Sequence, residues 1–425
     1  YMIRLLKKIF RRHQNLNYIN LGFKKIKQNN EVEKIFNSIN LFSDNSEIRY
    51  VGGCVRKVIN KEKVDDIDLA VNLKPREVCE ALKNKNIKYY ESGIEHGTIT
   101  ALIDGTKFEI TSLRKDVDTD GRHAKVEFSN SWKEDASRRD FTINSIYADI
   151  EGNLFDPFNG KKDLEIGEIN FIGDIETRIK EDYLRILRFI RFFLNYSKKK
   201  NDLKTIKIIK KNLVGLSKIS SERLLDEFQK LLRSDNFFKL FKNNDFLEII
   251  KLVFPQLKNI HQFSKLNEFA KKNFNKMNFI FLLSLMAIDG SDNVDYFIYK
   301  FNISKKDKKR ILFLNDFYSK KITIKTFSEK NLNKIFYFHG NQTLKDVILF
   351  KIFKSSKVDY KLLKLVRSFE NKVPPILPLR AITLMTKYNI PEGKKLGVKL
   401  KMIEELWVDN NFKISENEVQ EIVNG

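Results

Sequence analysis

The 425-residue chain has only two cysteines, Cys54 and Cys79, and no apolar run long enough to span a bilayer. Two thiols can form neither a disulfide framework nor a cysteine-based zinc site, which predicts a reducing compartment, the cytoplasm. The longest apolar run, FIFLLSLMAI at residues 279–288, is too short for a membrane span and predicts a buried helix. A membrane is therefore excluded as a partner.

The chain also has few histidines and no internal sequence repeats. No repeat of fixed period is present, which excludes a solenoid. None of the five histidines precedes an aspartate, which excludes a phosphohydrolase of the His-Asp type.

Acidic residues are in deficit: 79 Lys and Arg against 55 Asp and Glu leave a formal charge of +24. Such a surplus favours a polyanionic partner, above all nucleic acid. The alternative is the lysine-rich composition that an AT-rich genome produces. Residues 1–30 hold no acid at all, which fits either an organelle presequence or a basic helix that faces RNA.

The first part of the chain predicts a compact α/β unit built on one sheet. From residue 31 to about residue 160, short strand-like runs alternate with helical ones, and Asp104-Gly105 between two such runs predicts a type I′ hairpin. From Ile175 onward amphipathic or apolar helical stretches dominate. The sequence KVPPILPLR, from Lys372, predicts a break before a last helical segment.

Phosphate chemistry is indicated first by Gly52-Gly53, between the strand-like IRYV and the helical CVRKVIN. A tight turn from a strand into a helix presents backbone N–H groups to an anion, although such turns are common. Arg56, one turn into that helix, can add a charge-assisted contact to a triphosphate.

Paired carboxylates follow in VDDIDLAV. Residues i and i+2 of a strand share a face, so Asp66 and Asp68 are expected to form a pair, and a hard divalent cation, Mg²⁺, relieves their repulsion. Asp65 would face the other way as a surface residue. Glu109, which alternates with apolar neighbours in KFEITSL, is either a third carboxylate or a solvated strand residue.

Two arginine-rich stretches complete the polar set. RRDFTINS contains Arg139 and Asp140, which suit a phosphate and a sugar hydroxyl, or else a structural ion pair. EDYLRILRFIRFF predicts a helix that would not bury three arginines without partners. Its polar residues recur at steps of three: Asp182, Arg185, Arg188 and Arg191.

Together these motifs resemble the class II tRNA nucleotidyltransferase (CCA-adding enzyme) and bacterial poly(A) polymerase family. The resemblance rests on GGCVR, DIDL, GIEHGTITALI, FEITSLRKDVDTDGRHA, RRDFTINSIYAD, DPFNGKKDL and EDYLRILRFIRF, in the family's order. By motif position it assigns nucleotide binding to Gly52, Gly53, Arg56, Arg139, Asp140, Asp182, Arg185, Arg188 and Arg191. It assigns two magnesium ions to Asp66 and Asp68, with Glu109 as their helper in catalysis. Lys57 departs from the family, which usually has Asp there, and predicts altered local pairing.

The resemblance also implies an α+β fold, with a nucleotidyltransferase palm followed by an all-helical remainder. The expected parts are a basic segment (1–30), a catalytic head (31–160), a neck with the base-recognition helix (161–235), a body (236–371) and a tail that binds tRNA (372–425).

The implied function is template-independent addition of CCA to the tRNA 3′ end from CTP and ATP, with the acceptor stem and elbow recognised by shape. Asp182 and Arg185 would select the base, and RKDVDTDGRHA (residues 114–124) resembles the loop associated with the switch from C to A addition. The alternatives are a poly(A) polymerase on the same scaffold and an inactive RNA-binding homologue.

Overall fold

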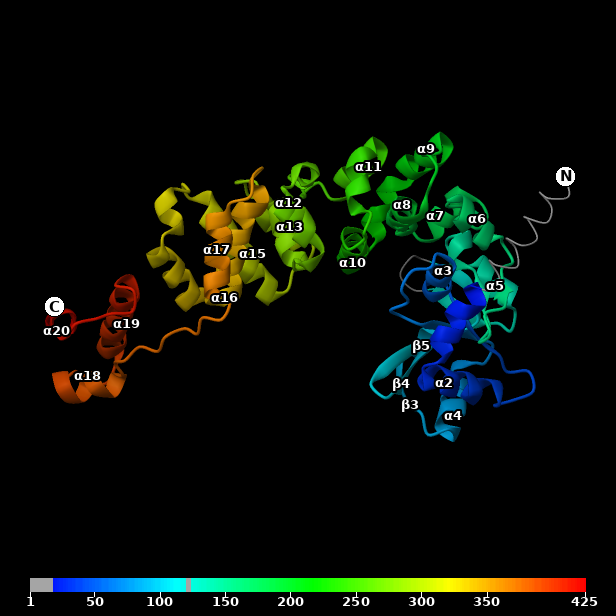
Figure 1. Cartoon of the computed structure of the whole chain (residues 1–425), viewed down its shortest axis with the longest axis horizontal. Coiled ribbons are helices and arrows are strands. Elements are labelled where there is room, and N and C mark those ends of the chain that lie inside the picture. The colour runs from blue at the N-terminus through cyan, green and yellow to red at the C-terminus, as the bar shows by residue number, and fades with distance from the viewer. Residues whose placement is uncertain (1–17, 120–123) are drawn as a thin grey trace. The chain divides into compact units, whose positions relative to one another are not determined.

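The structure is a computed structural model that describes residues 18–119 and 124–425. The chain divides into two compact units, Tyr1–Ile249 and Ile250–Gly425. A mixed sheet and its helices make up the first unit and helices the second, so the predicted α+β class is confirmed (Figure 1). The finer predicted boundaries at residues 160, 235 and 371 stay predictions.

The sheet of the first unit has seven strands in the order β3-β4-β5-β2-β1-β8-β9. Only β2 and β5 pair in parallel; the other neighbours are antiparallel. The strands are β1 (Ile48–Val51), β2 (Asp68–Val71), β3 (Lys88–Gly93), β4 (Thr98–Ile103), β5 (Thr106–Ser112), β8 (Tyr147–Ala148) and β9 (Leu154–Phe155). Two further strands, β6 (Arg114–Thr119) and β7 (Ala124–Phe128), form a separate antiparallel ribbon.

The β4–β5 hairpin follows directly from the sequence. Side chains of β4 alternate between half-buried and buried, which is the period of a strand with one covered face. Asp104 and Gly105 join the strands with φ values of +49° and +84°, as a type I′ turn requires, so the predicted hairpin is confirmed.

Helices cover the sheet and extend beyond it. They comprise residues 18–27, α2 (Asn30–Asn40), α3 (Gly53–Ile59), α4 (Pro75–Asn84), α5 (Trp132–Ser137), α6 (Gly160–Ile166), α7 (Ile175–Glu181), α8 (Arg185–Tyr196), α9 (Leu203–Asn212), α10 (Ser221–Leu232) and α11 (Asn244–Val253). Tyr50 of β1 lies buried between Phe23 and Phe36, with ring centroids 4.9 and 4.8 Å away, and so fastens two helices to the sheet. Each such aromatic pair contributes about 1 kcal/mol beyond the area it buries.

One segment differs from its sequence pattern. FTINSIYA looks like a continuous strand, but residues Thr142–Asn144 form a 3₁₀ turn and only Tyr147–Ala148 pair as β8. Helix α6 packs tightly on this turn: a Cβ on Gly160 would lie 2.0 Å from the carbonyl oxygen of Thr142, whose hydroxyl donates to Asp163 at 2.7 Å. This packing overrides the local strand preference.

The second unit is helical in its described part. Its helices are α12 (Glu268–Asn273), α13 (Phe279–Ala287), α14 (Asn293–Lys300), α15 (Lys305–Ser319), α16 (Glu329–Lys354), α17 (Tyr360–Phe369), α18 (Ala381–Tyr388), α19 (Lys394–Asp409) and α20 (Glu416–Asn424). Helix α13 is buried from Phe281 to Ala287, as its apolar run predicts. The irregular stretch at 372–380 precedes α18, where the proline-rich break was expected.

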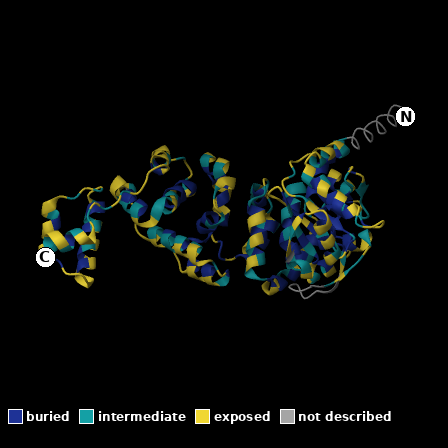
Figure 2. Ribbon diagram, turned by 90° about the horizontal axis from the view of Figure 1, so that it is seen from below, coloured by how far each residue is buried: buried dark blue, intermediate teal, exposed yellow. Residues whose placement is uncertain are grey.

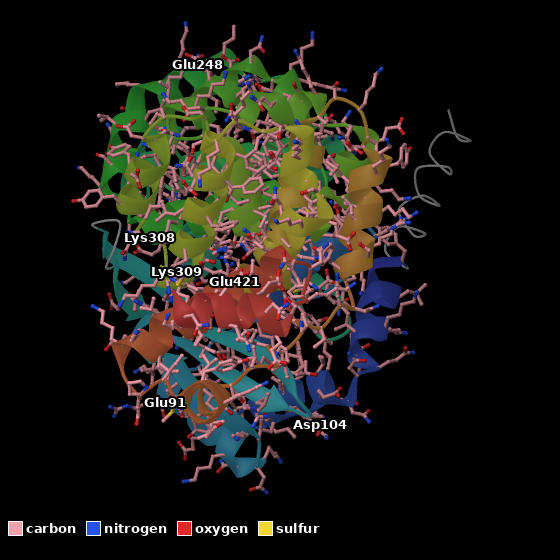
Figure 3. All side chains as sticks on the ribbon, turned by 90° about the vertical axis from the view of Figure 1, so that its left-hand side faces the viewer. Glu91, Asp104, Glu248, Lys308, Lys309 and Glu421 are labelled. Carbon is pink, nitrogen blue, oxygen red and sulfur yellow. The ribbon has the colours of Figure 1, made fainter. Side chains whose placement is uncertain are left out.

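Buried residues form the interior of each unit and exposed ones its surface (Figure 2), and most of the buried residues are apolar. Exposed examples are Glu91, Asp104, Glu248, Lys308, Lys309 and Glu421 (Figure 3). Among the helices that the structure describes, none combines the length and apolarity that a bilayer crossing requires.

Candidate functional site

A glycine turn between β1 and α3 forms one wall of a pocket in the first unit. Gly52 adopts φ +65° between the end of β1 and Gly53, the first residue of α3. Glycine is favoured there because a Cβ is strained in the left-handed region. A Cβ on Gly53 would lie 3.6 Å from Oδ2 of Asp68, and one on Gly52 would lie 3.8 Å from Nη1 of Arg139. The turn therefore lies between a carboxylate and a guanidinium.

Asp66 and Asp68 both line this pocket, but only Asp68 belongs to a strand. The prediction that one strand places both on the same face is therefore wrong for Asp66, which lies in an irregular segment. Strand β1 pairs with β2 only as far as Tyr50 opposite Leu69 and then turns away at the glycines, and the pairing of β2 with β5 starts at Asp68 opposite Glu109. Neither ladder reaches Asp66.

Asp65 is separated from its two neighbours. Its side chain is 56% exposed and pairs with Lys57 at 3.1 Å and Lys63 at 3.6 Å, as expected for a surface residue. The hydrogen bond from Lys57 lowers the pKa of the Asp65 carboxyl. The lysine that departs from the family pattern thus has an acidic partner on the adjoining loop.

The carboxylates suit a divalent cation. The side chain of Asp68 opens to the pocket, yet the pKa of its carboxyl is raised. The larger cause is burial of the carboxyl, and the second is the negative charge of Glu109, which lies opposite Asp68 in the parallel β2–β5 pairing. Among the described residues, no three His, Cys, Asp or Glu side chains are placed to hold a metal. Two hard oxygen ligands with room for phosphate oxygens are what Mg²⁺ commonly uses. Glu109 is exposed and is not among the pocket-lining residues, so its part stays a prediction.

Asp135, which the sequence argument missed, holds the two arginines that precede Asp140. It is 1% exposed, accepts from Nε of Arg138 at 2.8 Å, and binds Nε and Nη2 of Arg139 at 3.2 and 3.1 Å. The Tyr147 hydroxyl donates to it at 2.6 Å. Burial alone would raise the pKa of Asp135, but both arginines outweigh it and hold that pKa far below its usual range.

Asp140 sits in a second buried network. One oxygen accepts from Asn144 at 2.8 Å and the other from Nε of Arg188 at 2.6 Å, while Arg56 donates to the side-chain oxygen of Asn144. Burial raises the pKa of Asp140, but the charge of Arg188 and these hydrogen bonds lower it to about 2. The ion pair weighed as an alternative for this motif is therefore present.

The stretch expected to be one helix is broken at Asp182. Helix α7 ends at Glu181 and α8 begins at Arg185, so Asp182 lies between two helices. Its Oδ1 accepts from the amide of Leu184 at 3.2 Å, and its Oδ2 from Arg223 at 2.8 Å. Nη1 of Arg185 bonds Glu181 at 2.6 Å.

The remaining arginines of α8 meet an acid from α10. Glu227, 1% exposed, accepts from Nε of Arg191 at 2.5 Å and lies 4.0 Å from Nη1 of Arg188. The expectation that arginines in so apolar a helix need partners is confirmed, although Arg188 and Arg191 are only partly buried. The partner could have been found in SSERLLDEFQKLL, because Arg223, Glu227 and Lys230 recur at helical spacing on one polar face.

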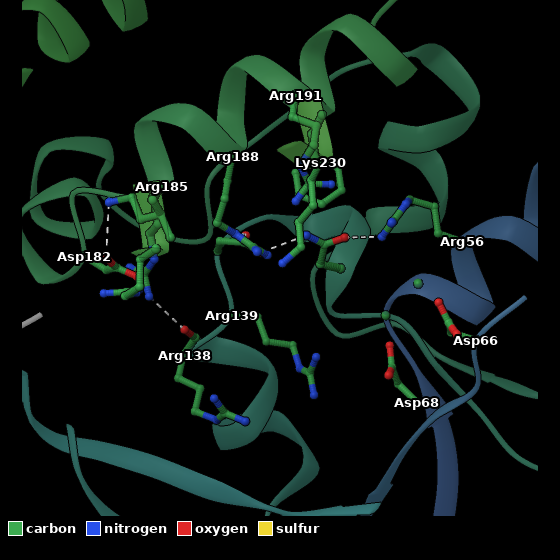
Figure 4. A pocket seen from close by; sticks show the side chains of 17 residues that line it. Arg56, Asp66, Asp68, Arg138, Arg139, Asp182, Arg185, Arg188, Arg191 and Lys230 are labelled. Atoms are coloured by element: carbon green, nitrogen blue, oxygen red, sulfur yellow. Dashed lines mark hydrogen bonds and ion pairs between the residues drawn. The ribbon is translucent and has the colours of Figure 1, made fainter. Parts of the chain in front are cut away.

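These groups enclose a pocket of about 650 Å³. Its walls are Gly52, Gly53, Arg56, Asp66, Asp68, Arg138, Arg139, Asp140, Asn144, Asp182, Leu184, Arg185, Arg188, Arg191, Phe192, Arg223 and Lys230. Eight of these side chains are basic and four are acidic, so the cavity favours a polyanion. The α8 arginines stand on one side and Asp66 and Asp68 on the other (Figure 4). Every predicted site residue except Glu109 lines this cavity.

Two predicted features fall partly outside the described residues. Residues 120–123 of the loop at 114–124 lie outside them, although β6 and β7 flank the gap. Residues 1–17 of the basic segment also lie outside them.

Comparison with known proteins agrees with this geometry. Residues 48–170 match the family described as "Poly A polymerase head domain", and residues 202–260 match "Probable RNA and SrmB- binding site of polymerase A". The mouse protein "CCA tRNA nucleotidyltransferase 1, mitochondrial" is 33% identical over 383 residues, covering 88% of this chain and 86% of that protein. The chain belongs to the CCA tRNA nucleotidyltransferase family.

Bacterial members of the family are similar too. A CCA-adding enzyme of Lactobacillus johnsonii is 28% identical over 89% of this chain and 93% of its own. The solved CCA-adding enzyme of Bacillus stearothermophilus, in complex with CTP, covers 89% of this chain and 92% of its own with a TM-score of 0.65 and 20% identity. At that identity the likeness shows the fold. Nucleotidyltransferases of this family use divalent metal ions.

Proposed function

We propose that this chain adds C, C and A in turn to the 3′ end of tRNA from CTP and ATP, releasing pyrophosphate. The observation that carries the proposal is a single pocket in which Asp66 and Asp68 face an arginine array across a glycine turn, in a chain of the CCA tRNA nucleotidyltransferase family. The separation of charge fits a nucleotide whose triphosphate lies between carboxylates and guanidinium groups.

The tRNA 3′-hydroxyl attacks the α-phosphate, and the P–O bond to pyrophosphate breaks, so no covalent enzyme intermediate is needed. Asp66 and Asp68 would hold Mg²⁺, which, when bound, polarises the reacting oxygens and offsets the charge of the phosphates. Arg139, whose Nη1 faces the glycine turn, and Arg56 would bind the triphosphate. Asp140, adjacent along the chain, would meet the ribose.

Base choice would follow from hydrogen-bond chemistry on the other side of the pocket. A carboxylate has about four acceptor positions, and Asp182 uses two of them on Leu184 and Arg223. The remaining positions can accept from the amino group of cytosine or adenine, which uracil lacks. Arg185 would donate to a ring acceptor of the base after exchanging its bond to Glu181.

The tRNA would be bound through its acceptor stem and elbow, by shape and phosphate contacts. The formal charge of +24 supports this, with the tail at 372–425 as one proposed contact. The only cysteines of the chain, Cys54 and Cys79, are buried free thiols, which fits the cytoplasm as the proposed location.

The test is incorporation of labelled CTP into a tRNA that lacks its CCA end, followed by labelled ATP. Two C and one A are expected for the wild type, and none above background for Asp66→Ala. Asp65→Ala is the matched control, because that carboxylate is exposed and outside the pocket. Wild-type rates for Asp66→Ala would contradict the site assignment.

The second candidate is a poly(A) polymerase, the activity in the name of the head-domain family matched at 48–170. The same assay separates the two functions. A poly(A) polymerase would extend the RNA with many A residues and would add no C.

A further inference from the structure

One buried carboxylate, that of Asp135, binds both arginines of the RRD motif (residues 138–140). Asp135 lies on α5, is 1% exposed, and binds Nε and Nη2 of Arg138 at 2.8 and 2.7 Å. It binds the same two nitrogens of Arg139 at 3.2 and 3.1 Å. Both arginines line the nucleotide pocket, whereas Asp135 itself does not.

Asp135 binds one edge of the Arg139 guanidinium and thereby determines the direction in which the other edge points. With Nε and Nη2 of Arg139 bound on one side, Nη1 lies on the other, 3.8 Å from where a Cβ of Gly52 would stand. A guanidinium is a planar fork, so fixing one edge fixes the direction of the other. The free edge thus faces the glycine turn.

Tyr147, on strand β8, hydrogen-bonds to both Asp135 and Arg139. Its hydroxyl donates to Oδ2 of Asp135 at 2.6 Å and accepts from Nε of Arg139 at 3.0 Å. Trp132, on the same helix as Asp135, packs edge-on against the tyrosine ring at 5.3 Å. Besides the two arginines, the carboxylate is therefore held by Tyr147, which does not line the pocket.

We propose that Asp135, braced by Tyr147, is a positioning residue that presets Arg138 and Arg139 for the triphosphate. This rests on the proposed function. An arginine without such a partner adopts several rotamers and must lose that freedom when the nucleotide binds, which weakens binding roughly up to tenfold for each side chain. The low pKa of Asp135 is consistent with a carboxylate that stays charged in this role.

The experiment compares Asp135→Asn and Tyr147→Phe with a matched control. Asp346 is likewise buried, at 2% exposed, and binds Nε and Nη2 of Arg310, but it lies in the second unit. Asp346→Asn therefore removes a buried aspartate–arginine pair without touching the nucleotide site. Equilibrium binding of CTP without tRNA, kcat and KM for CTP, and the unfolding midpoint are measured for each variant.

The expected result is a rise of about tenfold in the Kd and KM for CTP in Asp135→Asn, and a smaller rise in Tyr147→Phe, with kcat changed less. Asp346→Asn lowers the unfolding midpoint and leaves KM unchanged. In an Arg139→Ala background, Asp135→Asn has a clearly smaller effect, because one of the two arginines that it positions is gone.

An unchanged Kd and KM in a folded Asp135→Asn would overturn the proposal, as would an equal effect with and without the Arg139 side chain. If Asp135→Asn does not fold, Tyr147→Phe decides: an unchanged Kd overturns the proposal and a raised one supports it. Failure of the proposed function is distinct, since the wild type itself would then add no C to tRNA.

Discussion

Replacing Asp140 by asparagine tests the electrostatics of the pocket, because this carboxylate bridges the RRD motif and α8. Its pKa is about 2 against an ordinary 3.8. At about 1.4 kcal/mol per unit, the ionised carboxylate stabilises the fold by about 2 kcal/mol at pH 7. Loss of one partner of a fully buried pair costs about 3 to 5 kcal/mol. We expect a loss at the lower end of this range, because Arg188 is 31% exposed and still has Glu227 as an acidic neighbour at 4.0 Å.

The sign of the pH dependence follows from the lowered pKa. The stabilisation is fully present above the unfolded value of 3.8 and is lost as the pH falls through about 2. The difference in unfolding free energy between wild type and Asp140→Asn should therefore be constant from pH 7 to pH 5 and should shrink only below about pH 4.

The chain permits a clean assay, because its only two tryptophans, Trp132 and Trp407, lie in different units. In a Trp407→Phe background, urea unfolding followed by fluorescence reports the first unit alone. Glu165→Gln is the control, since its pair with Lys161 is half exposed and its loss costs at most about 1 kcal/mol. A loss for Asp140→Asn no larger than for the control would refute the reasoning. A difference that grows between pH 7 and pH 5 would refute it too, because the pKa of Asp140 would then be raised by burial and the folded state would gain stability as it takes up the proton.

Three further outcomes are expected. Asp182→Ala should relax discrimination against UTP and GTP, measured as ratios of kcat/KM, and unchanged selectivity would contradict its role at the base. Gly160→Ala should destabilise the first unit by about 3 kcal/mol, because the added Cβ would lie 2.0 Å from the carbonyl oxygen of Thr142. Gly397→Ala is the control, because the space around Gly397 is open and the substitution should not destabilise the chain. Equal effects of the two substitutions in urea unfolding would refute the packing argument. Affinity for tRNA should fall by roughly a thousandfold between 50 and 200 mM salt if binding rests on phosphate contacts, and a flat salt dependence in filter binding would exclude them.

Short sequence motifs predicted much of the secondary structure of the first unit. The Asp104-Gly105 hairpin and the glycine turn before α3 could be predicted because the backbone conformation there depends on a few adjacent residues. The strand-like run FTINSIYA forms a strand only at Tyr147–Ala148, for the opposite reason: α6, from farther along the chain, packs on residues Thr142–Asn144, which form a 3₁₀ turn.

The sequence by itself determined the class of fold, the residue types of the pocket and their order along the chain, because motifs and hydrophobic periodicity are local properties. Only the tertiary structure decided the partners. Asp135 looked like an ordinary helix residue, and the spacing of Arg223, Glu227 and Lys230 marked Glu227 only as a candidate partner. Folding buries both acids against arginines of the pocket. A buried arginine requires a counter-charge, but which acid supplies it depends on helices that meet only when the chain is packed.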